Sequence, residues 1–378
     1  MCDKKAKKIF ESHKKELSEL QIEKQAADDA LDRVTQGNTL LKDKESTLMD
    51  IFKCIKDFNS RSSDSLHQGS DPDEFVSLLP QEIWLKIFHE FSPYELCNIG
   101  LTCKSFLALT RDSSLWTEIS LVGDANAIAS TRSVTQLFNR CSHLVKVSIT
   151  SCDDISDIIL ALSKSCRQLK QIVVKYCQPL TYSDLSNLAN GCLKLESINF
   201  EGTNCLNGDG DSHEMEGSTM CRRGQSLSFS RLFGKFKCLK ELNLFLCRNL
   251  YSIDLELIAE HCQNLEYLNI DEIEYLTDKS VNFFIEQLGQ TIKYLWIDGE
   301  SLSDKSFSNF HKMVNLELLS ISFAVNMGQS GILSIGKLGN LKRLKLRKGE
   351  ELEPIDFVTT FAMGNLKTLL HLDISWCS

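Results

Sequence analysis

From Leu144 onward, apolar residues recur in a short pattern, LxxLxL, in which x is most often polar. Most copies begin 24 to 28 residues after the preceding one, as in the 25-residue step from Leu144 to Leu169. The alternation within each copy predicts a short strand with one buried face. The amphipathic 10 to 15 residues after it, as at 278–288, predict a helix. The first apolar residues of the copies are Leu144, Leu169, Leu195, Leu239, Leu265, Ile292, Leu316, Leu341 and Leu369.

Stacking of these units predicts the fold class. One strand–helix unit cannot bury its own apolar face, whereas stacked units share a continuous core and bend into an arc. We therefore expect an α/β solenoid over residues 118–378, with parallel strands on the concave side and helices on the convex side. The step from Leu195 to Leu239 is 44 residues long, which predicts a loop insertion at 203–226. The sequence stops directly after a predicted strand, so we expect a C-terminal cap to be missing.

The first segment, residues 1–58, has the pattern of a coiled-coil helix, because one heptad position is apolar six times in succession. The other core position is weaker, since it includes Lys24, Asn38 and Glu45. Three arrangements stay open: a homodimer through this segment, a single helix on the solenoid, or pairing with another protein. Polar, serine-rich residues predict a flexible linker at 59–74. The apolar heptad positions are Leu20, Ala27, Val34, Leu41, Leu48 and Ile55.

Three short helices are predicted between the linker and the first repeat. Pro80 suits the first turn of one helix, because its missing N–H costs nothing there. The sequence SPYE at 92–95 is a capping box that begins a second helix, and a third begins near Cys103. Helices this short cannot bury all their apolar side chains. The surplus predicts an exposed surface for another protein; the alternative is a helical cap on the repeats that follow.

This stretch resembles the F-box. The resemblance lies in LPxEI at 79–83, Ile87-Phe88, Glu95-Leu96, Cys103-Lys104-x-Phe106 and Leu115-Trp116, which fall in order at the spacing of that family. It implies an F-box at 75–117 that docks on the Skp-type adaptor of cullin–RING ubiquitin ligases, with Trp116 joining it to the first repeat strand. The repeats, with cysteines before and after the strands, resemble the cysteine-containing leucine-rich repeats. The residues expected at the adaptor are Leu79, Pro80, Glu82, Ile83, Ile87, Phe88, Leu96, Cys103, Lys104 and Phe106.

The composition of the chain argues against several classes of function. A net charge of −9 argues against nucleic-acid binding. Fifteen cysteines that recur with the repeat predict buried thiols in a reducing setting, the cytoplasm or the nucleus. No apolar run approaches the length of a membrane span, and no CxxC pair, phosphate-binding glycine loop or nucleophile elbow is present. We expect no catalytic residues, no cofactor, no metal site, and neither nucleic acid nor membrane as a partner.

Two classes of function follow. In the first, the chain is the substrate-recognition subunit of an SCF-type E3 ubiquitin ligase, reaching the cullin and RING subunits through the adaptor and promoting degradation of a bound target protein. In the second, it is a scaffold that uses the F-box without ubiquitin transfer. In either class the concave side is the expected target surface, with aromatic anchors beside a basic strand that suits acidic or phosphorylated residues. The residues expected there are Phe245, Tyr267, Tyr294, Trp296, Arg343, Lys345 and Arg347.

Overall fold

The computed structural model describes Val76 and residues 79–122, 131–153, 155–204, 232–247, 250–273, 276–349, 352–363 and 366–375. The chain forms two compact units, Met1–Leu109 and Thr110–Ser378. The predicted coiled coil at 1–58, the linker at 59–74 and nearly all of the predicted insertion at 203–226 lie outside the described residues.

In the first unit, three helices follow one another: α3 (Gln81–Phe88), α4 (Pro93–Gly100) and α5 (Lys104–Leu109). The capping box predicted for α4 is present, because the Ser92 amide N–H donates to Glu95 Oε2 at 2.7 Å and the Glu95 amide N–H donates to Ser92 Oγ at 3.4 Å. The apolar side chains that pack between the helices form the core of this unit. Its buried side chains are Trp84, Phe88, Leu96 and Leu109.

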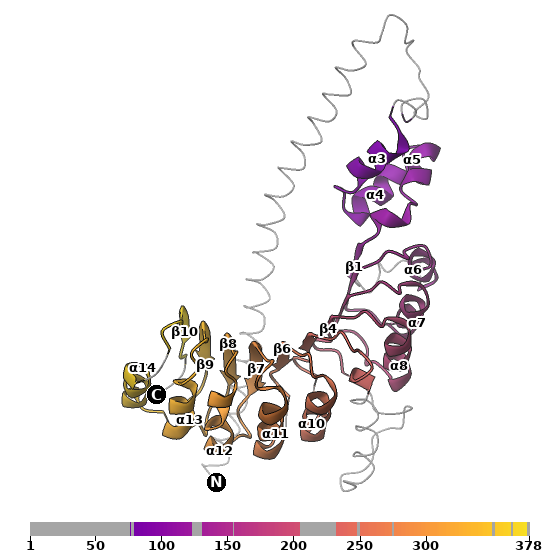
Figure 1. Ribbon diagram of the computed structural model, residues 1–378. Coiled ribbons are helices and arrows are strands. Elements are labelled where there is room, and N and C mark those ends of the chain that lie inside the picture. The colour runs from indigo at the N-terminus through magenta and orange to yellow at the C-terminus, as the bar shows by residue number, and fades with distance from the viewer. Residues whose placement is uncertain are drawn as a thin grey trace, which may run out of the picture. The chain divides into compact units, whose positions relative to one another are not determined.

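In the second unit, a parallel sheet follows the order of the chain from β1 to β10, with each strand hydrogen-bonded to the next. Figure 1 shows the strands side by side along the inner side of an arc and the helices along its outer side. The predicted solenoid with parallel strands is therefore confirmed. The strands are β1 (Glu118–Val122), β2 (Lys146–Thr150), β3 (Gln171–Lys175), β4 (Ser197–Asn199), β5 (Glu241–Asn243), β6 (Tyr267–Ile270), β7 (Tyr294–Asp298), β8 (Leu318–Ser322), β9 (Arg343–Leu346) and β10 (His371–Asp373).

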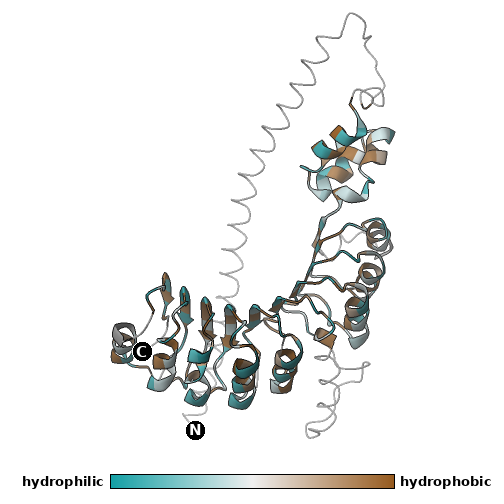
Figure 2. Ribbon diagram, in the orientation of Figure 1, coloured by the Kyte–Doolittle hydropathy of each residue, from teal (hydrophilic) through white to brown (hydrophobic). Residues whose placement is uncertain are grey.

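The outer layer consists of short helices that follow the strands in the described part of the chain. Figure 2 shows hydrophobic and hydrophilic residues on these helices, as expected where one side packs on a core and the other meets solvent. They are α6 (Thr131–Phe138), α7 (Ile155–Ser165), α8 (Tyr182–Gly191), α10 (Ser252–His261), α11 (Asp278–Leu288), α12 (Asp304–Phe307), α13 (Gln329–Ile335) and α14 (Pro354–Met363), with 3-10 turns η1 (Ser113–Leu115) and η2 (Phe310–Lys312).

The core lies between the sheet and the helices. On most strands the alternate residues that point toward the helices are buried, such as Val147 and Ile149 on β2, and so are helix side chains such as Phe284 of α11. Burial of each such side chain contributes roughly 1.5–3 kcal/mol. The thiols of the repeats join this core: Cys166 Sγ donates to the Phe138 carbonyl of the preceding repeat at 3.8 Å, and burial raises the pKa of Cys192 to about 12.

Polar contacts tie each repeat to its neighbour. After several strands the backbone turns through the left-handed region at a residue other than glycine, for example Ser151 at φ 56° and Tyr176 at φ 50°. That conformation costs of order 1 kcal/mol or more. The same residues donate their amide N–H to the next repeat, Ser151 to the Lys175 carbonyl at 2.9 Å and Tyr176 to the Glu201 carbonyl at 3.0 Å. The turn is thus held by stacking, which the sequence pattern did not reveal.

Carboxylates link successive helices on the convex side. Asp278 at the start of α11 accepts hydrogen bonds from the Ser303 amide at 2.9 Å and from Ser303 Oγ at 2.6 Å, one repeat later. Asp304, at the start of α12, in turn accepts from the amides of Gly328 and Gly331 at 3.0 and 2.8 Å. The starts of α11 and α12 therefore each cap the beginning of the next helix, so these neighbouring repeats reinforce each other.

Candidate functional site

The ten residues predicted to contact the adaptor lie partly on the surface of the first unit and partly in its core. Ile83 is one of the exposed members, with 38% of its surface accessible. Pro80, Glu82 and Lys104 are also exposed, and Leu79, Ile87, Cys103 and Phe106 are half-buried. The remaining two, Phe88 and Leu96, lie inside the unit.

Phe88 and Leu96 are therefore corrections to the predicted contact surface. The Phe88 ring lies 5.4 Å from the Phe106 ring and 5.9 Å from the Trp84 ring, measured between centroids, and only 2% of Phe88 is exposed. Leu96 is fully buried. The apolar stripe of α3 is wide enough that part of it faces α5, so Phe88 packs the core while Ile83 reaches the surface. Trp84 also belongs to this core, although the sequence pattern alone does not point to it.

Two large side chains of this unit that were not predicted at the adaptor, Leu101 and Tyr94, are more exposed than Ile83. Leu101, at the end of α4, is 83% exposed and Tyr94 is 77% exposed, while Leu107 on α5 is also exposed. Large apolar residues left open on so small a unit agree with the prediction of a surface for another protein, which stays a prediction. In the sequence, such a surface is indicated by more apolar residues than three short helices can bury.

Trp116 lies at the start of the second unit. It is buried, and its Nε1 donates to the Thr110 carbonyl at 2.8 Å. Both residues belong to the unit that begins at Thr110, and β1 starts two residues after the tryptophan. Trp116 therefore anchors the segment that leads into the first strand; the predicted joining of the two units stays a prediction.

On the concave side of the solenoid, three of the four predicted aromatic residues form a cluster. The Tyr267 ring on β6 lies 4.8 Å from the Trp296 ring and 6.4 Å from the Tyr294 ring on β7, between centroids. All three side chains are half-buried, so part of each ring is open. Phe245 follows the end of β5, and among the described residues no ring contact joins it to the cluster.

The predicted basic strand is present two strands farther along the sheet. Arg343, Lys345 and Arg347 alternate along β9 and just past its end, and all three are exposed. Between the buried residues of β9 these side chains point away from the helices, toward the concave side. No ion pair within 4 Å engages any of the three among the described residues. They are therefore available to an anionic partner.

β8 separates the aromatic cluster from the basic strand. Its concave residues Leu318, Ser320 and Ser322 lie level with residues of both neighbours: Trp296, Ser320 and Lys345, for instance, share one row of the sheet. The three are buried although they face away from the helices. Their partners in the same rows are larger side chains, such as Trp296 on β7 and Lys345 on β9 beside Ser320. The sequence predicted aromatic and basic residues on one face. It did not reveal that the concave residues of the strand between them are buried.

Carboxylates collect at the ends of the strands on this face. Asp271 follows β6, and Ser322 Oγ donates to its Oδ2 at 2.9 Å. Burial raises the pKa of Asp271, although this hydrogen bond opposes the effect. Burial also raises the pKa of Asp298, at the end of β7, to about 7, and the negative charges of Asp271, Glu272 and Glu300 add to the rise. This end of the face therefore gathers several carboxylates, and burial raises the pKa of two of them, Asp271 and Asp298.

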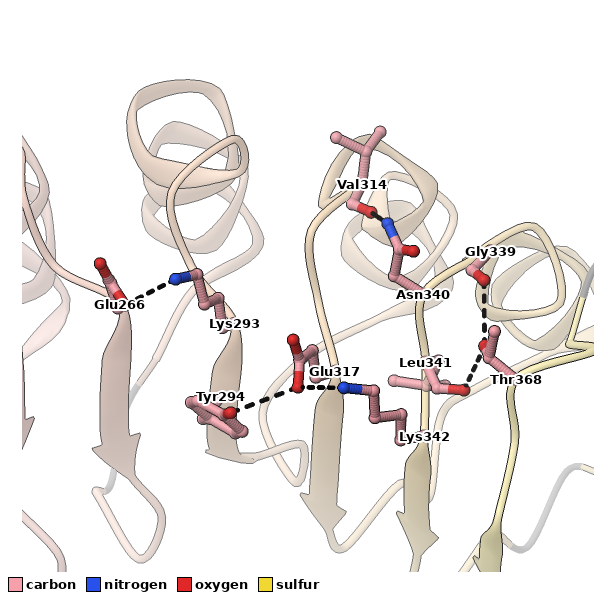
Figure 3. A network of polar contacts seen from close by, with 10 residues as sticks. All are labelled: Glu266, Lys293, Tyr294, Val314, Glu317, Gly339, Asn340, Leu341, Lys342 and Thr368. Atoms are coloured by element: carbon pink, nitrogen blue, oxygen red, sulfur yellow. Dashed lines mark hydrogen bonds and ion pairs between the residues drawn. The ribbon is translucent and has the colours of Figure 1, made fainter.

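At the beginnings of the strands, lysine and glutamate alternate from repeat to repeat. Lys293 pairs with Glu266 at 2.8 Å, and Lys342 pairs with Glu317 at 2.9 Å, while Tyr294 donates to Glu317 at 3.2 Å. Figure 3 shows these contacts side by side, together with the Asn340 amide that donates to the Val314 carbonyl. Exposed pairs of this kind contribute about 1 kcal/mol or less each. Their charges are already balanced, so this edge offers a partner less than β9 does.

Among the residues that the structure describes, no helix combines the length and the hydrophobicity that a membrane crossing needs.

Comparisons with known proteins agree with this arrangement. Residues 76–122 match the F-box-like family model. The F-box/LRR-repeat protein 4 of Bos taurus is 28% identical over 132 residues, which are 34% of this chain and 19% of that protein. The matched segment thus spans about a fifth of this curated relative.

Solved structures of low sequence identity also align with the chain. One is a yeast complex of Rad7 and Elc1, with 15% identity, a TM-score of 0.40, and coverage of 87% of this chain and 86% of that one. Another is the TLR13–ssRNA13 complex, with 16% identity, a TM-score of 0.42, and coverage of 70% and 34%. The F-box-like match, together with the similarity to an F-box/LRR-repeat protein, supports an F-box/leucine-rich-repeat family for this chain.

Proposed function

We propose that this protein is the substrate-recognition subunit of an SCF-type E3 ubiquitin ligase. The observation that carries the proposal is the F-box-like match at 76–122, followed in the same chain by a ten-stranded solenoid with an open concave face. F-box domains generally bind Skp-type adaptors. The first unit would hold the adaptor and, through it, the cullin and RING subunits, while the solenoid holds a target protein.

The proposed mechanism is proximity. The receptor performs no bond chemistry and needs no cofactor; it holds a lysine of the target near a ubiquitin-loaded conjugating enzyme and raises its effective concentration there. Ubiquitin transfer on the partner subunits then marks the target for proteasomal degradation. The expected setting is the cytoplasm or the nucleus, because the buried cysteine columns of the repeats are free thiols.

The proposed adaptor surface lies on the exposed side of α3 and the segment before it. Leu79, Pro80, Ile83 and Ile87 supply half-buried or exposed apolar area, and Glu82 and Lys104 supply charge at its border. An interface with an apolar centre and a polar rim is the usual arrangement for a stable protein complex. Phe88 and Leu96 support this surface from within the unit.

The test is a pull-down from cell lysate with the full chain and with the double variant Leu79→Ala/Pro80→Ala. The wild-type chain should capture the adaptor together with the cullin, and the double variant should capture neither. Leu193→Ala removes an exposed leucine of the solenoid, 59% open, and serves as the matched control with unchanged capture.

Two results would count against the proposal. Undiminished adaptor capture by the double variant would remove the assigned docking surface. Capture of the adaptor without the cullin would favour a scaffold that uses the F-box outside ubiquitin transfer. A target found with the wild-type chain should also accumulate in cells when the proteasome is inhibited.

A further inference from the structure

The concave surface of β7, β8 and β9 has two chemically different sides. On β7, Trp296 and Tyr294 stand beside Tyr267 and expose part of an aromatic cluster. On β9, Arg343 and Lys345 are exposed cations. Adjacent strands lie about 4.8 Å apart, so the aromatic and the basic rows are roughly 10 Å apart across β8. This spacing matches the width of one extended peptide with side chains on both sides.

The spacing along β9 also fits an extended partner. Alternate residues of a strand are about 6.6 Å apart, so the three cations Arg343, Lys345 and Arg347 form a line of roughly 13 Å. Alternate residues of an extended peptide repeat at the same distance. A line of this kind matches several carboxylates in succession better than one phosphate group, which binds donors that converge on a single point.

The charged residues around Arg343, Lys345 and Arg347 differ between the two ends of this line of cations. Arg343 lies level with Tyr294, Leu318 and His371, and the same row of β6 holds Tyr267, so this row carries no carboxylate from β6 to β10. At the other end, Asp271 interacts electrostatically with Arg347. A hydrogen bond from Ser375, and then the charges of Arg347 and Lys345, lower the pKa of Asp373.

We propose that this surface binds an extended segment of the target in which acidic and apolar residues alternate. The acidic side chains face β9 and pair first with Arg343, and the apolar side chains lie on Tyr294 and Trp296. At the other end of the line, Asp271 already interacts with Arg347, so acidic residues of the segment pair there less favourably than at Arg343. This inference rests on the proposed function only in taking the solenoid as the part that holds the target.

The test measures peptide binding to the purified full chain by fluorescence anisotropy. The probe is a labelled nine-residue peptide that alternates glutamate with leucine and phenylalanine. A second peptide has the same composition with all glutamates at one end, a third has lysine in place of glutamate, and a fourth carries a single phosphoserine among neutral polar residues. The alternating acidic peptide should bind most tightly, and its affinity should fall as salt is raised.

Variants locate the binding surface. Arg343→Glu should weaken the alternating peptide at least tenfold, and Trp296→Ala should weaken it severalfold by removing an aromatic anchor. Arg167→Glu makes the same change in net charge at an exposed residue outside these strands and should leave the affinity unchanged. Circular dichroism of each variant shows whether the solenoid stays folded, and Arg343→Lys should retain part of the binding if the positive charge matters.

Each contrary outcome overturns the proposal. Failure of the alternating peptide to bind the wild-type chain, equal binding of the block peptide, tighter binding of the lysine or phosphoserine peptide, or no effect of Arg343→Glu would each do so. Adaptor capture, measured on the same preparations, separates the two proposals. A chain that captures adaptor and cullin but not the peptide keeps its proposed function and loses this inference, whereas a chain that binds the peptide without the adaptor does the reverse.

Discussion

Replacement of Phe88 and of Ile83 by alanine tests how the first unit divides its apolar residues between core and surface. Phe88 is buried among the rings of Trp84, Phe91 and Phe106, at centroid distances of 5.9, 6.3 and 5.4 Å. Ile83, five residues earlier on the same helix, is 38% exposed. The sequence pattern predicted that both residues contact the adaptor. In the structure Phe88 packs in the core, whereas Ile83 lies at the surface.

The expected magnitudes differ by severalfold. Truncation of a buried phenylalanine to alanine costs about 3–5 kcal/mol, and the loss of three ring pairs places Phe88→Ala toward the upper end. A unit of some 30 residues has a free energy of unfolding of only about 2–4 kcal/mol. Phe88→Ala should therefore leave α3, α4 and α5 largely unfolded. Ile83→Ala loses part of an exposed side chain and should cost about 1 kcal/mol.

Hydrogen exchange of the full chain, followed by mass spectrometry, measures this difference locally. Peptides from residues 81–109 should exchange at least a hundredfold faster in Phe88→Ala and only a few times faster in Ile83→Ala, while peptides from β6 to β8 stay unchanged. Both variants should lose adaptor capture, the first by unfolding and the second by loss of contact. Unchanged exchange in Phe88→Ala combined with lost capture would show that Phe88 contacts the adaptor directly and that its placement in the core is wrong.

Three further predictions concern the solenoid and the N-terminal segment. Because the folded pKa of Asp298 is raised to about 7, ionisation opposes folding as pH rises from about 4 through 7; Asp298→Asn should therefore raise the melting temperature more at pH 8 than at pH 4, and an equal shift at both would contradict this. Under native conditions at pH 8, iodoacetamide should alkylate exposed Cys238 and spare buried Cys192, whose pKa is raised to about 12 by burial; mass spectrometry distinguishes them. If residues 1–58 form a self-pairing coiled coil, sedimentation should find the full chain dimeric and residues 59–378 monomeric. The same oligomeric state for both proteins would rule out that homodimer.

Much of the candidate docking unit could be read from contiguous residues, and the rest could not. The capping box at Ser92 and Glu95 depends only on neighbours in the chain, so the start of α4 was predictable. Whether Phe88 or Ile83 is buried depends on where α5 packs against α3. Two residues of one helical stripe look alike in the sequence, yet only one of them meets the Phe106 ring.

The amino-acid sequence by itself determined the architecture of the solenoid, because each LxxLxL copy encodes its strand within a few adjacent residues and the repeat period brings equivalent residues into line. It also placed aromatic and basic residues on the concave side. Only the tertiary structure decided how they combine: Trp296, Ser320 and Lys345 come from three repeats and share a row through the register of β7, β8 and β9. Ser320 is buried, and burial together with the charges of Asp271 and Glu272 from the preceding repeat raises the pKa of Asp298; such surroundings are set by stacking, which local periodicity does not encode.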